Sequence, residues 1–307
     1  MKRDLISVAD MEKDLMALLE LSQSLRNRRT AAEVSEPLKG KSLAMIFEKP
    51  STRTRVSFEV AMTDLGGHAL NLSPADLQLG RGETIADTAR VLSRYVHGIM
   101  YRAFKHSDML ELASHATVPV INGLDDLEHP CQILADLLTI KEKKSELKGL
   151  KVAYVGDGNN VCNSLLLGCA FLGMNMSAGC PEGYEPDADI LAKAVSRGRE
   201  QGTRIDVIED PMAAAKDADV IYTDVWVSMG AEKEKRKRMK AFRDYQVNAE
   251  LVAVAKKDCI VMHCLPAHRG IEITNEVLDG PRSVVFDQAE NRLHAQKAIL
   301  MTFLGGR

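Results

Sequence analysis

Short apolar runs alternate along the first half of the chain with stretches in which apolar residues recur at helical spacing. A helix is predicted over Met11–Arg28, with Asp10 as its N-cap. The run Ser42–Phe47 is almost entirely apolar, which is typical of a buried strand. A further helix is predicted over Arg53–Leu65, because the Gly66-Gly67 pair follows it. This alternation of strands and helices predicts βαβ units and a parallel sheet.

A second series of the same kind occupies the second half of the chain. The apolar runs that we predict to be strands read KVAYVGD, MNMSAG, RIDVIE, DVIYTD, CIVMH and SVVFD. Long helical stretches flank the series, at Pro130–Lys144 and at Gln288–Leu304. We therefore predict an α/β protein of two domains, each a mostly parallel sheet flanked by helices, joined by long helices. The predicted limits are 1–143 for the first domain, with helix 288–307 packing back on it, and 144–287 for the second.

The composition is consistent with two self-sufficient cores. The chain has 307 residues, of which 45% are hydrophobic, so neither core needs disulfides or a metal to hold it. The formal net charge is -3, which gives no global field that would attract nucleic acid or an anionic membrane. An anionic substrate would therefore have to be held by local arginines.

None of the 6 cysteines sits in a CxxC pair, which excludes a zinc ribbon and a thioredoxin-like protein. Most of the cysteines lie in apolar runs and are predicted to be buried thiols in a reducing compartment. The N-terminal segment lacks the apolar core of a secretion signal, and no run approaches the ~18 apolar residues of a membrane span. We therefore expect a soluble, cytoplasmic protein that binds no membrane.

The segment 231–240, which reads AEKEKRKRMK, is a run of charge. Its ordinary interpretation is a solvated helix face or loop. The segment directly follows one of the candidate sites described below, so a mobile lid is the alternative interpretation.

A candidate phosphate site follows the first predicted strand, where Pro50 sets a turn before a helix. Ser51, Thr52 and Thr54 offer hydroxyl groups there, and Arg53 can form a fork on phosphate oxygens. The first N–H groups of a helix have no partner inside it and carry the positive end of its dipole, which also suits phosphate. An ordinary Ser/Thr cap is the alternative, but the density of hydroxyls and arginines favours an anion site.

Further polar residues of the first half stand at the ends of predicted elements. Arg102 comes directly after a strand, where ligands of parallel sheets bind, although an arginine is common at such a place. His129 and Gln132 lie at the first turn of the helix that begins at Pro130. An imidazole and an amide there could hold a carbonyl oxygen and an NH2 group. The alternative is a helix cap with a solvent-facing histidine.

The second half offers three more candidate sites. Gly156 and Gly158 open a helix after a strand, but Val161 stands where a dinucleotide fingerprint has its third glycine, which argues against NAD. Asp224 ends a strand before the loop that holds the only tryptophan, and a carboxylate there suits a ligand ammonium. Cys264 follows another strand and is a candidate nucleophile, ligand or polar contact. The histidines near it lack the spaced partner ligands of a zinc site.

Together these segments resemble the aspartate/ornithine carbamoyltransferase family, and the resemblance spans the chain. The run Ser51–Thr54 is similar to the family's carbamoyl-phosphate signature, and His129–Gln132 is similar to its H-P-x-Q element. The D-x-x-x-S-M-G loop that begins at Asp224 resembles the ornithine branch rather than the aspartate branch. The H-C-L-P sequence that begins at His263 does so as well.

The resemblance implies a role for each matching residue. The catalytic residues would be Arg102, His129, Cys264 and Arg292. Carbamoyl phosphate would be bound by Ser51, Thr52, Arg53, Thr54, Gln78, Arg102, His129, Pro130, Cys131, Gln132, Cys264, Leu265 and Arg292. Ornithine would be bound by Asn160, Asp224, Ser228 and Met229. The family's catalytic unit is a trimer, and Gln78 would reach into the site of a neighbouring subunit.

The implied reaction moves the carbamoyl group of carbamoyl phosphate onto the δ-amine of L-ornithine, giving L-citrulline and phosphate, a step of arginine biosynthesis. Carbamoyl phosphate is already an activated acyl donor, so we expect the reaction to need no metal or organic cofactor. An amine of this kind has an unperturbed pKa of ~10.4, so only roughly one molecule in 2,500 is neutral at pH 7. We expect closure of the second domain to lower that pKa by desolvation.

Three alternatives stay open. The nearest keeps the reaction and changes the acceptor to N-acetylornithine, putrescine or aspartate. The second is a non-catalytic protein that binds carbamoyl phosphate, against which Arg53, Arg102 and His129 argue. The third is a nicotinamide oxidoreductase built on Gly156 and Gly158. Arginine catabolism in place of synthesis also stays open, as does any assembly beyond a trimer.

Overall fold

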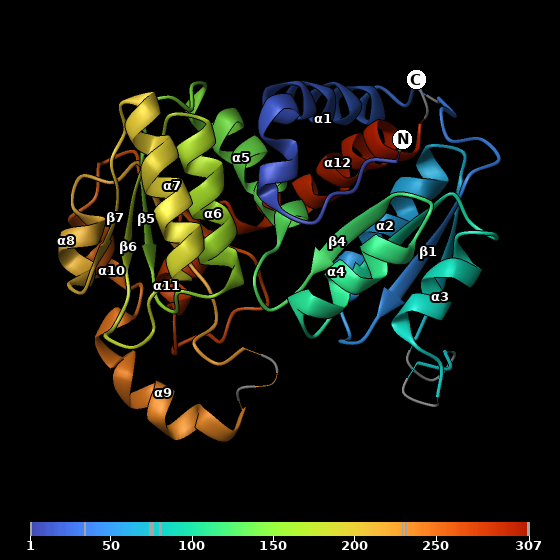
Figure 1. The fold of residues 1–307 in the computed structure, drawn as a ribbon. Coiled ribbons are helices and arrows are strands. Elements are labelled where there is room, and N and C mark those ends of the chain that lie inside the picture. The colour runs from blue at the N-terminus through green and yellow to red at the C-terminus, as the bar shows by residue number, and fades with distance from the viewer. Residues whose placement is uncertain are drawn as a thin grey trace. The chain divides into compact units, whose positions relative to one another are not determined.

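The computed structural model describes residues 2–33, 35–73, 77–79, 82–228, 230 and 232–305. The chain forms two compact units: unit 1 is Met1–Leu138 with Glu290–Arg307, and unit 2 is Thr139–Ala289. The chain passes from one unit to the other within two long helices, α5 (Pro130–Lys144) and α12 (Val285–Leu304) (Figure 1). The fold class predicted from the sequence, two parallel sheets flanked by helices, is confirmed. The limits 1–143 and 144–287 stay predictions.

The sheet of unit 1 has four strands in the order β2-β1-β3-β4, and all neighbours pair in parallel. They are β1 (Ser42–Phe47), β2 (His68–Leu72), β3 (Gly98–Arg102) and β4 (Val120–Leu124). The inner strands β1 and β3 are almost wholly buried, which explains their apolar sequences. The edge strand β2 was missed in the sequence because all five of its residues are partly or fully exposed.

The helices of unit 1 pack around this sheet. They are η1 (Val8–Asp14), α1 (Leu15–Thr30), α2 (Thr52–Asp64), α3 (Ile85–Leu92) and α4 (His106–His115), with the start of α5 and the end of α12. Figure 1 shows α3 and α4 together on one side of the sheet, where Ala89 and Met109 belong to the same core cluster as Ile46 and Tyr101. Figure 1 also shows α12 beside α1, where Arg26 pairs with Glu290 at 3.6 Å.

The first helical segment begins earlier than predicted, and Asp10 is not its N-cap. Ser7 is the N-cap, since its side chain accepts the N–H of Ala9 at 3.1 Å. Asp10 instead accepts the N–H of Ser7 at 2.8 Å, which completes a capping box. The segment is also divided, because its first seven residues form the 3-10 helix η1 before α1 begins at Leu15.

The sheet of unit 2 has five parallel strands in the order β7-β6-β5-β8-β9. They are β5 (Lys151–Val155), β6 (Asn175–Gly179), β7 (Ile205–Ile208), β8 (Val220–Thr223) and β9 (Ile260–His263). The helical segments are α6 (Asn160–Phe171), α7 (Ala188–Gln201), α8 (Pro211–Ala215), η2 (Glu232–Glu234), α9 (Lys235–Ala241), η3 (Arg243–Tyr245), α10 (Ala249–Ala253) and α11 (Asn275–Leu278). Helices α6 and α7 pack together, while α8, α10 and α11 share a core cluster with β5, β8 and β9.

The sixth strand predicted for this unit, SVVFD, does not form. Ser283 makes one isolated parallel bridge with Val261, and the N–H of Val284 donates to the Val261 carbonyl at 3.0 Å. The chain then turns directly into α12 at Val285, three residues before the predicted start of that helix. The run holds three apolar residues, of which Val284 and Val285 are buried and Phe286 is 71% exposed. Such a short run cannot by itself distinguish a strand from the first turn of a helix.

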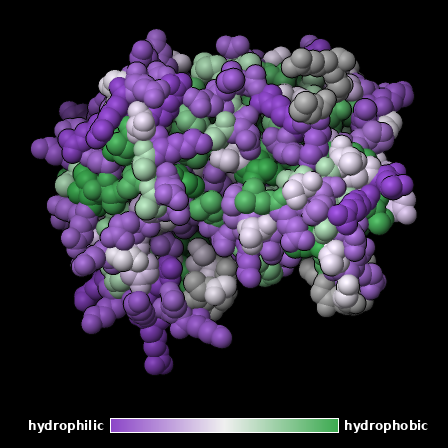
Figure 2. All heavy atoms as spheres, viewed as in Figure 1, coloured by the Kyte–Doolittle hydropathy of each residue, from purple (hydrophilic) through white to green (hydrophobic). Residues whose placement is uncertain are grey.

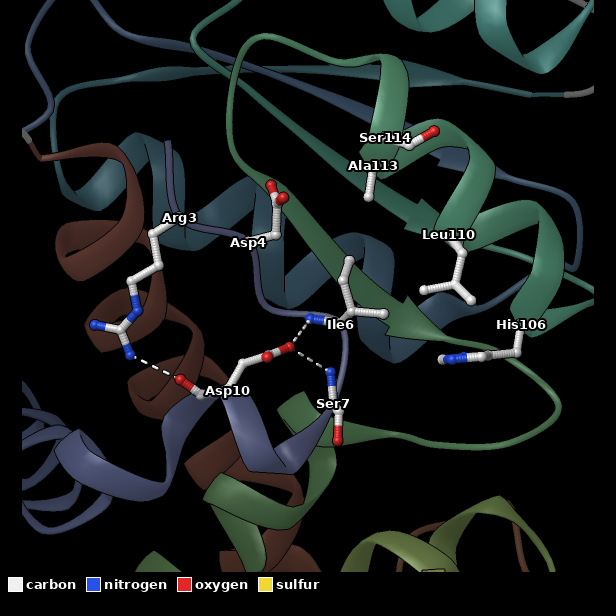
Figure 3. Close-up of a pocket in the computed structure, with 9 residues that line it drawn as sticks. All are labelled: Arg3, Asp4, Ile6, Ser7, Asp10, His106, Leu110, Ala113 and Ser114. Atoms are coloured by element: carbon white, nitrogen blue, oxygen red, sulfur yellow. Dashed lines mark hydrogen bonds between the residues drawn. The ribbon is translucent and has the colours of Figure 1, made fainter. Parts of the chain in front are cut away.

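Unit 1 also holds a surface hollow of about 580 Å³ between the N-terminal segment and α4 (Figure 3). Its charged groups are engaged with the protein: Asp10 accepts two backbone N–H groups, and Arg3 donates to the Asp10 carbonyl at 2.8 Å. None of the candidate site residues lines it. We therefore regard the hollow as part of the packing of the N-terminal segment. Within the described part of the chain, no helix combines the length and the apolar character that crossing a membrane requires.

Candidate functional site

In unit 1 the loop after β1 leads into the N-terminus of α2, as the phosphate-site prediction requires. Ser51 is the N-cap, and its Oγ accepts the N–H of Thr54 at 3.3 Å. Capping uses a lone pair of the hydroxyl, so Ser51 keeps its own proton to donate. Thr52 is exposed and Arg53 is partly exposed, so both can reach a ligand. Ser51 can therefore serve as a cap and an anion donor together, the two functions that the sequence presented as alternatives.

A buried network connects this loop to the helix that follows β4. Arg292 of α12 donates through Nη2 to Thr54 Oγ1 at 3.2 Å and through Nη1 to Gln132 Oε1 at 2.5 Å. Gln132 in turn donates through Nε2 to Asp136 Oδ1 at 2.8 Å. All four side chains are at least 97% buried, so the guanidinium is fixed from both sides. The structure thus brings together Thr54, Gln132 and Arg292, which the resemblance assigned to carbamoyl phosphate.

The same region concentrates positive charge. Arg102 ends β3 and is buried, and Lys49 lies with its Nζ 4.7 Å from the centre of the Phe104 ring. Burial lowers the pKa of Lys49, and the neighbouring Arg102 lowers it further. Cations held this close repel one another, so a bound anion would relieve an unfavourable charge arrangement. The region is therefore suited to a phosphate group.

His129 is buried beside these arginines. Burial holds the pKa of His129 well below its usual value, and the charges of Arg292 and Arg102 lower it further. A neutral imidazole has one N–H to donate, which is what a carbonyl oxygen needs from a neutral donor.

We expect His129 to stay neutral in the folded protein at every pH near neutrality. Its pKa is depressed in the folded state and ~6.5 in the unfolded chain, so the unfolded chain binds the proton first. The stability contribution of the neutral ring is therefore present above pH ~6.5 and is lost as the pH falls below it. Nitrogen NMR of the histidine rings, assigned with a His129→Gln variant, measures this. A His129 ring that becomes an imidazolium near pH 7 would contradict the assignment.

Cys131 and Pro130 begin α5, as predicted. The Cys131 thiol is fully buried and lies 3.3 Å from the Asn122 carbonyl, to which it donates. Burial raises its pKa to about 12. We therefore expect any contact of Cys131 with a ligand to come from its backbone.

Gln78 lies in the loop between β2 and α3, between Leu77 and Leu79, which pack against the core of unit 1. Its carbonyl accepts the N–H of Glu83 at 3.4 Å, and its neighbour Leu79 forms a bridge with Glu83. Its side chain is exposed, which suits a residue that acts outside its own chain.

In unit 2 the candidate acceptor site is built around Asp224, at the carboxyl end of β8. Asp224 is 6% exposed, and its two oxygens have different partners. Asn159 donates to Oδ2 at 2.8 Å, and the Cys264 thiol donates to Oδ1 at 3.0 Å. Asn159 is itself held as the N-cap of α6, where its Oδ1 accepts the N–H groups of Val161 and Cys162. A carboxylate that is oriented in this way is suited to an ammonium group.

The loop after β9 is held by hydrogen bonds of the buried His263 ring. The N–H of Leu265 donates to His263 Nδ1 at 2.9 Å, which leaves the ring proton on Nε2 to donate to Glu272 at 3.1 Å. Leu265 has a φ of 57°, a conformation that a non-glycine residue adopts only when its surroundings impose it. Glu272 and His263 therefore hold the backbone of the Cys264–Leu265 segment.

Among the described residues, Asp224, His263 and Cys264 form the group that could ligate a metal ion, with ligand atoms within 4.8 Å of one another. The sequence did not reveal Asp224 as a partner of the other two, because 39 positions separate it from His263. Both ring nitrogens of His263 have protein partners, so a metal would have to displace one of these hydrogen bonds.

Of the other residues that the resemblance assigned to ornithine, the structure describes Asn160 and Ser228. Asn160 is the first residue of α6, and Ser228 is partly exposed in the loop after Asp224. Met229 lies outside the described residues.

The glycines of the GDG sequence have structural reasons that require no dinucleotide. A Cβ on Gly158 would lie 2.3 Å from the backbone of Glu185, so only glycine fits there. The N-terminus of α6, where a pyrophosphate would bind, is occupied by the side chain of Asn159. The arrangement argues against the nicotinamide alternative.

Sequence reasoning missed three polar residues of these networks. Asp136 could have been found, because it stands four residues after Gln132 on a predicted helix and therefore on the same face. Asn159 could not be recognised as a partner of Asp224, because 65 positions separate the two residues. Lys49 had no distinguishing signal, since a lysine after a strand is usually a surface residue.

Comparison with known proteins connects both units to one family. The family model described as "Aspartate/ornithine carbamoyltransferase, carbamoyl-P binding domain" matches residues 3–142. The model described as "Aspartate/ornithine carbamoyltransferase, Asp/Orn binding domain" matches residues 148–303.

Full-length relatives and a solved structure give the same result. The chain is 60% identical to an ornithine carbamoyltransferase of Archaeoglobus fulgidus, over 99% of this chain and 98% of the relative. It is 59% identical to one of Methanosarcina acetivorans, over 99% of this chain and 100% of the relative. The solved ornithine carbamoyltransferase of Pyrococcus furiosus superposes with a TM-score of 0.96 at 56% identity, covering 99% of this chain and 98% of the other.

Proposed function

Because the chain belongs to the aspartate/ornithine carbamoyltransferase family, we propose that it transfers the carbamoyl group of carbamoyl phosphate to the δ-amine of L-ornithine, giving L-citrulline and phosphate. The observation that carries the choice of ornithine is Asp224, a buried carboxylate that Asn159 and Cys264 orient. The names of the full-length relatives support the same acceptor.

We propose that unit 1 binds the donor. The α2 N-terminus with Ser51, Thr52 and Arg53 holds the phosphate, together with Arg102. As the bond to phosphate breaks, negative charge grows on the leaving oxygens, and these fixed cations stabilise it. Arg292 and the neutral His129 serve the carbamoyl oxygen, on which charge develops when the amine attacks. Gln132 has its amide oriented by Asp136 and Arg292, and it positions the carbamoyl NH2 group.

We propose that unit 2 binds the acceptor through Asn160, Asp224 and Ser228, with Met229 carried over from the family pattern. The attacking amine must be neutral, because only a neutral amine has a lone pair that can attack the carbonyl carbon. Asp224 pairs with an ornithine nitrogen and fixes its direction. As the new C–N bond forms and the C–O bond to phosphate breaks, the amine loses one proton, which leaves with the phosphate product.

The alternative acceptors fit this site less well. Aspartate would place a second carboxylate against Asp224, which costs free energy in a desolvated site. N-acetylornithine lacks the α-ammonium, and putrescine lacks the α-carboxylate. Free ornithine brings an ammonium for Asp224 and a carboxylate for the side-chain donors of Asn160 and Ser228.

We propose that the protein works as a homotrimer in the cytoplasm, in arginine metabolism. The side chain of Gln78 is exposed, which supports shared sites because an exposed side chain can reach a neighbouring chain. The six cysteines are free thiols, which suits a reducing compartment. The Cys264–Leu265 segment, held by His263, would contact the carbamoyl group, as the family pattern implies.

Mixing two inactive variants tests the shared site. Arg53→Ala should lose at least ~2–3 kcal/mol of transition-state stabilisation, roughly 30- to 150-fold in rate, because a charge-assisted phosphate contact disappears. Gln78→Ala should be similarly impaired. When the two are unfolded together and refolded, some hybrid sites contain neither change, so activity should rise above that of both parents. Mixtures no more active than the parents would exclude a contribution of Gln78 to a neighbouring site.

The reaction itself is tested by incubating the protein with carbamoyl phosphate and ornithine. We expect citrulline and phosphate in equal amounts. Phosphate without citrulline would mean hydrolysis and would contradict the proposal.

A further inference from the structure

One arginine of the charged segment 231–240 is turned inward, against the ordinary interpretation of that segment. In the region of α9, hydrophilic side chains cover the molecular surface (Figure 2), and no residue of α9 is fully buried. Residues 233–237 and Lys240 are exposed, whereas the Arg238 side chain is only 15% exposed. A guanidinium group that is shielded from water at the edge of a polar helix needs specific hydrogen-bond or ion-pair partners.

Those partners come from three segments of unit 2. Arg238 Nη1 donates to Asp157 Oδ2 at 2.7 Å and to the Trp226 carbonyl at 3.1 Å. Its Nε donates to Glu234 at 3.3 Å, and the guanidinium carbon lies 4.9 Å from the centre of the Tyr184 ring. Such a planar, forked contact is specific to arginine, since a lysine ammonium cannot stack and bridge in this way.

Two of these partners stand in the loops that carry the proposed ornithine contacts. Asp157 lies in the loop between β5 and α6, two residues before Asn159 and three before Asn160. Trp226 lies midway between Asp224 and Ser228. One guanidinium therefore joins the two loops, while Asn159 and Asp224 join them through their own hydrogen bond.

The surroundings of this contact are rigid. Trp226 is 3% exposed, and its ring stacks on Phe242 with 5.9 Å between centroids. Tyr184, which supports the guanidinium, packs edge-on against the same Phe242 at 4.8 Å. Asp157 is buried, and burial raises its pKa to about 6 although Arg238 lowers it. Removing Arg238 would leave this acid without a cation in a poorly solvated place.

We propose that Arg238 is a positioning residue for the acceptor: it holds the β5–α6 loop and the loop after β8 in the arrangement that binds ornithine. This inference rests on the proposed function. Arg238 acts through Asp157 and Trp226 rather than by touching the substrate. Without this contact only the hydrogen bond between Asn159 and Asp224 joins the two loops, so Asp224 and Asn160 are held less well for binding the ligand together.

The test compares Arg238→Met with Arg236→Met. Both variants remove one arginine from α9, but Arg236 is exposed and lies two residues from the contact. We expect Arg238→Met to raise the KM for ornithine by roughly 10- to 100-fold, while the KM for carbamoyl phosphate changes less than about twofold. Arg236→Met should match the wild type. Arg238→Lys keeps the charge without the fork, and it should restore only part of the ornithine affinity.

Two further measurements separate positioning from general damage. Trp226 is the only tryptophan, so its fluorescence reports the loop directly, and thermal unfolding shows whether each variant is folded. In an Asp157→Asn background, Arg238→Met should raise the KM for ornithine by a smaller factor than in the wild type, because the pair is already broken. Equal factors in the two backgrounds would overturn the role of the pair.

The outcomes distinguish this inference from the proposed function. If the wild type forms citrulline and Arg238→Met behaves like Arg236→Met, the inference fails and the proposed function stands. Equal effects of Arg238→Met on both substrates would also overturn it. If the wild type forms no citrulline, the proposed function fails first.

Discussion

Replacing Asp224 by asparagine should weaken ornithine binding by about 2–5 kcal/mol and leave carbamoyl phosphate binding nearly unchanged. The substitution keeps the shape of the side chain and removes the charge that pairs with an ornithine nitrogen. The Asn159 amide would then face another amide, and the Cys264 thiol would lose a carboxylate acceptor. Titration of each ligand into the folded variant by calorimetry measures the two affinities separately.

The same strand provides a matched control. Asp219 precedes β8 and Asp224 follows it, and both acids are buried. Asp219 accepts the Lys151 N–H at 2.9 Å and pairs with Lys256, so its role is structural. Asp219→Asn should lower the free energy of unfolding without changing the affinity of the folded protein for ornithine. If Asp224 were only a loop cap, Asp224→Asn would behave in the same way and cost about 1 kcal/mol of stability. Equal weakening for both ligands, or for neither, would reject the assignment.

Replacing Arg292 by lysine should lower kcat by roughly 100- to 1,000-fold. Lysine keeps the charge but cannot donate to Thr54 and Gln132 together while it also serves the carbamoyl oxygen. The loss should appear in the chemical step, because charge on that oxygen develops only in the transition state. Single-turnover kinetics with both substrates bound measures that step.

Lys297 of the same helix is the control for this experiment. It is buried and pairs with Asp64 of α2, away from the candidate site. Lys297→Met should therefore reduce stability while the folded fraction keeps its kcat. A normal kcat in Arg292→Lys would show that Arg292 only supports the packing of α12.

The sequence predicted well those strands and helices whose pattern of apolar residues has a single physical cause, such as burial. Strands such as β1 and β5 are almost wholly buried, so each appears as a nearly continuous apolar run. The edge strand β2 is only half-buried and lacks that signal. The run SVVFD shows the opposite error. The start of α12 has an apolar sequence like that of a strand, and it was therefore predicted as one.

Residues of the candidate site could likewise be predicted from the sequence only where a local pattern identified them. Clusters that are local in sequence, such as Ser51–Thr54, could be predicted from the chemistry of a helix N-terminus. The role of Arg292 came only from the family resemblance, because its partner Thr54 is 238 positions away. Arg238 shows the limit most clearly. Arg238 lies in a run of charged residues whose pattern predicts exposure to solvent, and its acidic partner Asp157 lies 81 positions earlier in the chain.

The measurement that tests the central claim most directly is carbamoyl transfer from carbamoyl phosphate to a panel of acceptors. L-ornithine, N-acetylornithine, putrescine and L-aspartate would be compared by kcat/KM, with each carbamoylated product identified by mass spectrometry. The site around Asp224 predicts that L-ornithine has the highest kcat/KM and that citrulline is its product. A higher kcat/KM for any other acceptor, or no carbamoylated product from ornithine, would contradict the claim.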